Sequence, residues 1–150
     1  GSRDVRPNMP VVSPDGVVGV TLHVSGDEAD VQLAVDASFV VDVEDERTKA
    51  RGYVRGTGDA SRHLCKVEAI DSRDLVEIGD LLVTSGKGER FPHGIPVARI
   101  TKVNKRELGR AQEVEAAPTV DFTRLASVLI IVTQPTKGEA SDPTAKKEKR

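Results

Sequence analysis

The chain has 150 residues, which suits one domain or two very small ones. Apolar residues make up 37% of it, aromatic residues only 3%, and Trp is absent, so a core has to be built from aliphatic side chains, chiefly Val. The charged residues mix both signs and leave a net charge of −2, which gives no electrostatic reason to expect a nucleic-acid partner. No apolar run approaches the ~20 residues that a membrane helix needs.

The first half of the chain alternates between apolar and polar side chains, the pattern of strands with one buried face. A Ser-Pro-Asp-Gly turn at 13–16 precedes the first of them, since Pro presets its own φ and Gly accepts a positive one. Charged residues at 45–49 indicate a hairpin turn. The strands predicted in this half are 17–24, 31–35, 39–44, 51–56 and 64–70.

The second half continues in short segments separated by Gly and Pro. Strands are predicted at 81–83, 97–103, 110–116 and 128–132, and the last, which is wholly apolar, is interpreted as buried on both faces. With about ten short strands and no long helix, the fold class is all-β, with two small β-barrel-like subdomains of short antiparallel strands. The predicted organisation is an expression remnant and linker over 1–8, a first subdomain over 9–70, a second over 71–134, and a disordered tail over 135–150. The boundary near residue 70 leaves open that one subdomain is inserted in the other.

No catalytic, cofactor-binding or metal-ligating set emerges from the sequence. The three histidines stand apart from one another and from cysteine, without a metal-ligand spacing. Ser85, His93 and Asp80 are the residue types of a hydrolytic triad, but the Gly-x-Ser-x-Gly motif that raises a nucleophile is missing. Cys65, the single cysteine, lies in a predicted strand and is interpreted as a small buried side chain.

Four basic residues lie close together around the predicted hairpin turn. Strand alternation would place them on one face, which predicts a solvated hairpin face, with a binding site for an acidic partner as the alternative. They are Arg47, Lys49, Arg51 and Arg55.

Six segments, taken in order over residues 9–134, carry a family resemblance. They are MPVVSPDGVVGV (9–20), ADVQLAVD (29–36), ARGYVRGTG (50–58), GDLLVTSG (79–86), FPHGIPV (91–97), and DFTRL (121–125) leading into VLI (128–130). Together they resemble the rod shape-determining protein MreC family. Ala98 departs from the family pattern, where Gly is usual after Pro-Val.

The resemblance implies a non-catalytic scaffold of the bacterial cell-elongation machinery. The implied partners are further copies of the chain, a class B penicillin-binding transpeptidase, RodA and MreD, with no nucleic acid. It also implies a periplasmic location, with an inner-membrane anchor formed by an N-terminal helix outside this sequence. The motif residues expected to serve structure or interfaces are Gly16, Gly19, Gly52, Gly56, Gly79, Asp80, Ser85, Gly86, Phe91, Pro92 and Gly94.

Two questions stay open at this level. A periplasmic adaptor of the membrane-fusion type is the alternative function, because such proteins also carry Val-rich β-barrels. Docking is expected through exposed strand edges and turns, with 91–96 as the candidate loop. Phe91 in that loop either closes the core of the second subdomain or contacts a partner.

Overall fold

The computed structural model describes residues 5–58, 64–71, 74–88, 90–104, 112–125 and 128–132. These residues form ten strands and no helix, so the all-β prediction is confirmed. The strands are β1 (Pro10–Ser13), β2 (Gly16–Ser25), β3 (Glu28–Leu33), β4 (Val40–Asp45), β5 (Arg51–Gly56), β6 (Cys65–Glu68), β7 (Leu81–Thr84), β8 (Pro96–Asn104), β9 (Glu113–Pro118) and β10 (Leu129–Ile130).

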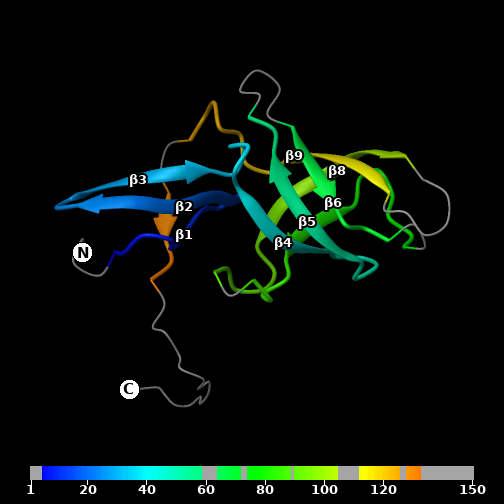
Figure 1. The fold of residues 1–150 in the computed structure, drawn as a ribbon, viewed down its shortest axis with the longest axis horizontal. Helices are drawn as coiled ribbons and strands as arrows, with labels where there is room; N and C mark the ends of the chain where they lie inside the picture. The colour runs from blue at the N-terminus through cyan, green and yellow to red at the C-terminus, as the bar shows by residue number, and fades with distance from the viewer. Residues whose placement is uncertain are drawn as a thin grey trace, which may run out of the picture.

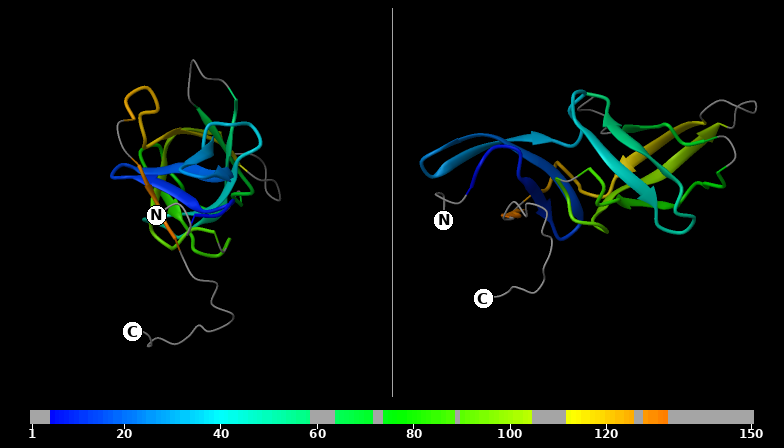
Figure 2. Two further views of the ribbon diagram at one scale, coloured as in Figure 1. Left: turned by 90° about the vertical axis from the view of Figure 1, so that its left-hand side faces the viewer. Right: turned by 60° about the horizontal axis from the view of Figure 1, so that its bottom comes forward.

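One of the two units is a four-stranded antiparallel sheet with the strand order β10-β1-β2-β3. The predicted turn at 13–16 joins β1 to β2, and the register between these strands shifts between Val11 and Val12. The long strand β2 begins beside the barrel and carries the sheet away from it (Figures 1 and 2). The sheet therefore projects from one end of the molecule.

The other unit is a closed antiparallel barrel with the strand order β4-β5-β6-β9-β8-β7. Pairing of β4 with β7, which sets Val43 opposite Thr84, closes it. The barrel takes strands from both sides of residue 70, so the boundary expected there is corrected: it falls inside the barrel. Local hydrophobic patterning marks strands but does not say which strands pair. The barrel is inserted between β3 and β10 of the sheet, the arrangement that the sequence left open.

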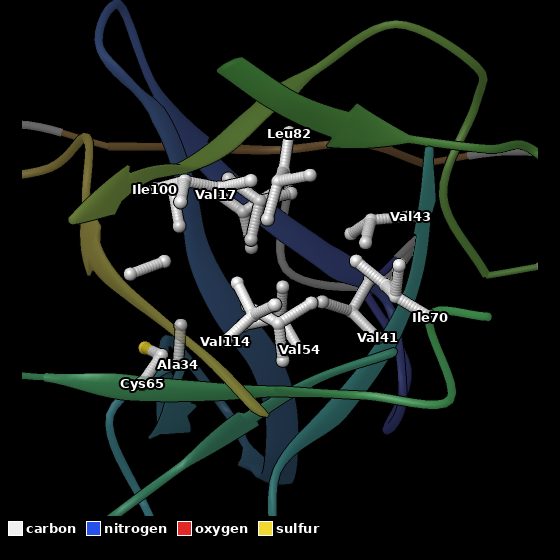
Figure 3. Packing of buried hydrophobic residues seen from close by; sticks show 14 of the residues in the cluster. Val17, Ala34, Val41, Val43, Val54, Cys65, Ile70, Leu82, Ile100 and Val114 are labelled. Carbon is white, nitrogen blue, oxygen red and sulfur yellow. The ribbon is translucent and has the colours of Figure 1, made fainter. Parts of the chain in front are cut away.

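A single Val-rich core fills the barrel and reaches into the sheet. Val41 and Val54 from the barrel wall point toward Leu82 and Ile100 from the opposite wall, as Figure 3 shows. Val17 of β2 belongs to the same cluster, so the first half of β2 closes one end of the barrel. A smaller cluster under the sheet joins Val11, Val18 and Val120.

Of the predictions for the ends of the chain, the structure tests the one for 128–132. The segment 128–132 was expected to be buried on both faces, and this was wrong: only Leu129–Ile130 form a strand, at the edge of the sheet, and Leu129 is 69% exposed. Its apolar run reflects one packed face, since Ile130 packs against the smaller cluster. The predictions for residues 1–4 and for the tail beyond 132 lie outside the described residues.

Candidate functional site

The most specific motif residues lie around the connection from β7 to β8. Thr84 fastens this loop, because its hydroxyl donates to the carbonyl of Pro92 and accepts from the amide of Ile95 at 2.9 Å. Its carbonyl accepts from the amide of Gly94. Gly86 and Gly94 turn the chain with φ of 79° and 97°, a region that glycine enters without strain. The motif thus specifies a tightly held loop.

Phe91 closes the core from this loop. Its side chain is buried and meets the ring of Phe39 edge to face, with centroids 6.4 Å apart. Of the two interpretations of Phe91, the core position is therefore confirmed. Pro92 and Gly94 remain on the surface, so the exposed part of the candidate docking loop is short.

Asp80 belongs to a buried polar cluster at the start of β7. Arg47 donates to both oxygens of its carboxylate, from Nε to Oδ1 at 3.0 Å and from Nη2 to Oδ2 at 2.8 Å. These bonds lower the pKa of Asp80 to about 2. The neighbouring carboxyl of Asp45 is fully buried, and burial, helped by Asp80, raises its pKa to about 6. Gly79, with φ of 97°, donates its amide to Ile100 and accepts from Arg99, which pins the turn before Asp80.

The three residue types of a hydrolytic triad have separate partners. The Ser85 hydroxyl donates to Asp42 Oδ1 at 2.7 Å, and His93 Nε2 lies 3.0 Å from Glu44 Oε2. The carboxylate of Asp80 accepts hydrogen bonds from the guanidinium of Arg47. The structure therefore places Ser85 as an anchor of the loop to β4 rather than beside a base.

The four motif glycines of the first half lie where another segment of backbone passes. A Cβ added at Gly19 would lie 1.8 Å from the carbonyl oxygen of Gln32, and one at Gly56 would lie 2.2 Å from that of Asp36. Gly16 and Gly52 are similarly crowded. These positions hold strands and loops together rather than present a surface.

The basic cluster around the hairpin turn is balanced by carboxylates on neighbouring segments. Each of its four members forms an ion pair and each side chain is at least 42% exposed, so the solvated hairpin face is confirmed. The pairs are Arg47–Asp80, Lys49–Glu44, Arg51–Asp42 and Arg55–Glu68.

Strand edges are confined to the sheet. The barrel is closed, whereas β3 and β10 each pair with one neighbour among the described strands. An unpaired edge can accept a strand from another chain. From the sequence we expected unpaired strand edges on both subdomains. Closure of the barrel removes such edges from the barrel.

The remaining features of the described residues concern metal binding, the cysteine thiol and membrane-spanning helices. Among them no group of three or more His, Cys, Asp or Glu side chains could hold a metal ion, and His63 lies outside them. Cys65 is buried as expected, and burial raises the pKa of its thiol to about 11. Within the same part of the chain, no helix has the length and apolar character needed to span a membrane.

Known proteins resemble this chain in sequence and in fold. MreC of Escherichia coli is 34% identical over 128 residues, which are 85% of this chain and 34% of that protein. The chain therefore spans about a third of this relative. The crystal structure of MreC from Pseudomonas aeruginosa superposes with a TM-score of 0.79 at 31% identity, over 85% of this chain and 81% of that one.

A more distant likeness concerns a complex of penicillin-binding protein PBP2 with MreC from Helicobacter pylori. It has a TM-score of 0.57 at 17% identity, over 72% of this chain and 65% of that one, and it shows the shared fold alone. Residues 1–132 also match the family described as rod shape-determining protein MreC, barrel core. This match decides against the membrane-fusion adaptor, and the chain belongs to the rod shape-determining protein MreC family.

Proposed function

We propose that this chain is a non-catalytic scaffold module of the machinery that elongates the bacterial cell wall, acting outside the cytoplasm. Its family membership supports the role in cell shape. A similar structure, at 20% identity and a TM-score of 0.64, is the major periplasmic domain of the cell shape-determining filament MreC, which supports the location and self-association. The Helicobacter pylori complex supports a penicillin-binding transpeptidase as a partner. RodA, MreD and an N-terminal membrane anchor are proposed on family resemblance.

The observation that carries a docking role is the open sheet beside a closed barrel. Two copies or two partners can add strands to the sheet only at β3 and β10, the outer members of its described order. The edge at β10 presents Leu129, which is 69% exposed and lies opposite Val12 in the register with β1. A large exposed apolar side chain on a short free edge is a favourable anchor for a second chain. We assign self-association to this edge.

Matched charge insertions test the assignment. Leu129→Glu should weaken self-association in sedimentation velocity, and binding to the soluble region of the elongation transpeptidase should be measured in parallel by calorimetry. Leu75→Glu is the control, because Leu75 is equally exposed at 67% but lies outside every strand. If the two variants associate as strongly as the parent while remaining folded, the β10 edge is not the interface.

A further inference from the structure

A shallow pocket of about 300 Å³ opens on the outside of the barrel, between the β4–β5 face and the loop that ends at Phe91. Val40 and Val41 line it from β4, Tyr53 from β5, and Gly86 and Gly88 from the loop. The volume lies at the lower limit for small-molecule sites, so it suits a side chain better than a cofactor. Gly86 and Phe91 of its lining belong to the motif segments of the sequence, whereas Val40 and Arg90 lie outside them.

Arg90 lines this pocket as a half-buried cation that has no counter-ion among the described residues. Its guanidinium donates to the carbonyl of Val40 at 2.7 Å and to Asn8 Oδ1 at 3.2 Å, which uses two of its five N–H donors. It also lies over the rings of Phe39 and Phe91, 5.6 and 5.7 Å from their centroids. No carboxylate of the described residues pairs with it, and burial lowers its pKa. The described arginines at 47, 51 and 55, by contrast, each hold a carboxylate.

The remaining charges around the pocket do not repel an anion strongly. Asp42 is the one acidic residue among the described residues of the lining, and Arg51 Nη2 pairs with it at 2.7 and 2.8 Å from its two oxygens. The Ser85 hydroxyl also donates a hydrogen bond to Asp42 Oδ1, and Lys87 adds a favourable positive charge nearby. Arg51 and Lys87 therefore add positive charge beside the described lining of the opening.

The other walls suit an extended peptide. Tyr53, the single tyrosine of the chain, is 43% exposed and supplies a flat aromatic surface with a hydroxyl at its tip. Gly86 and Gly88 carry no side chains, so another backbone can approach the loop closely. Apolar walls beside a cation match an acidic side chain with apolar neighbours.

We propose that this pocket binds the side-chain carboxylate of an acidic residue within an extended, otherwise apolar peptide segment of a partner protein. Arg90 receives the carboxylate through its free N–H donors, while Tyr53 and Val40 contact the flanking side chains. A guanidinium held by two aromatic rings is already oriented, so little conformational entropy is lost on binding. The site lies on the barrel, apart from the β10 edge, and its test does not depend on which protein supplies the peptide.

A pair of blocked tripeptides tests the proposal by amide NMR of the full chain. Acetyl-Leu-Glu-Leu-amide should shift the amide signals of Gly86, Gly88 and Arg90, and acetyl-Leu-Gln-Leu-amide should bind about tenfold more weakly, because it lacks the charge-assisted bonds. Arg90→Gln should remove the preference for the Glu peptide. Lys102→Gln, a cation removed from β8 outside this pocket, is the matched control and should change nothing.

A second variant protects the test against loss of folding. Gly88→Val fills the opening without touching the contacts of Arg90, because a Cβ there meets only Asp42 Cβ, at 3.5 Å. It should abolish binding of the Glu peptide. Equal shifts with both peptides, unperturbed signals for Gly86, Gly88 and Arg90, or unchanged binding to the Gly88→Val protein would each overturn the proposal.

Discussion

The carboxyl group of Asp45 is fully buried and interacts with the carboxylate of Asp80, which helps to raise the pKa of Asp45. Asp45 Oδ1 accepts from the amides of Arg47 and Thr48, at 2.8 and 3.1 Å, whereas no described group donates to Asp45 Oδ2. If Asp45 is protonated, Oδ2 becomes a donor to Asp80 and the unsatisfied atom disappears. Below about pH 6 the pair therefore holds one proton where the end of β4 meets the start of β7.

Stability should fall as the pH rises from about 4 to about 6. The folded-state pKa of Asp45, about 6, lies above its ordinary value of 3.8, so between these values the folded chain binds a proton that the unfolded chain has lost. The contribution present below pH 4 and lost above pH 6 is about 3 kcal/mol. Asp80 acts in the opposite sense: its pKa of about 2 adds stability above 3.8 that is lost as the pH falls through 2. Urea denaturation from pH 2 to 8 measures both slopes.

Asp45→Asn isolates the Asp45 contribution. An Asn amide donates to Asp80 at every pH and its oxygen still accepts from the two amides, so the slope between pH 4 and 6 should vanish. The variant should be more stable than the parent at pH 7.5 by about 3 kcal/mol. A variant that loses stability at pH 7.5 and keeps the slope would show that Asp45 is ionised in the folded chain.

Phe91→Ala should lower the free energy of unfolding by about 3 kcal/mol, because it empties a buried site against Phe39. The measurement is thermal or urea denaturation. Pro92→Ala, at the exposed neighbouring position, should change stability by less than about 0.5 kcal/mol. Parent-like stability of Phe91→Ala would place that ring outside the core.

Gly19→Ala should cost more than about 3 kcal/mol, because the new Cβ would lie 1.8 Å from the carbonyl oxygen of Gln32 and would force β2 and β3 apart. Gly26→Ala is the comparison: its φ is 59° and nothing lies within 4 Å, so only backbone strain of about 1 kcal/mol is added. Urea denaturation ranks the two, and a smaller loss for Gly19→Ala than for Gly26→Ala would contradict the crowding.

Cys65 should not react with Ellman's reagent at pH 8 in the folded chain. Its side chain is buried and the pKa of its thiol is raised to about 11, so both access and thiolate are lacking. Since it is the one cysteine in the sequence, the released chromophore reports on this site alone. Reaction should become complete in denaturing urea, and rapid reaction without urea would show that the barrel opens around β6.

Strand identity could be read from the sequence better than strand pairing. The alternation over 17–24 gave β2, and the turn signal at 13–16 joins it to β1, yet β1 itself was missed because its Val11-Val12 pair does not alternate. The pairing of β6 with β9, across two intervening strands, has no local signature in the sequence. The barrel boundary could not be placed for that reason.

The buried polar cluster at the start of β7 could be predicted only in part from the sequence. Asp80 was singled out by its motif, but Asp45 sits in a run of charged turn residues that is typical of solvent exposure. The burial of Asp45 is explained only by the folded turn. There the amides of Arg47 and Thr48 donate to Asp45 Oδ1, and the Arg47 side chain pairs with Asp80. No sequence pattern marked Arg90 either, because the lack of a pairing carboxylate among the described residues is a property of its folded surroundings.

The pairing of Val11 with Ile130 joins segments from opposite ends of the described chain, with the whole barrel between them. Closing so long a loop in an unfolded chain is entropically costly, and a folded barrel makes it short. Assembly of the sheet should therefore finish last, after the barrel has brought β10 back to β1. A substitution confined to the barrel would then delay or loosen β10 without altering any contact that β10 makes.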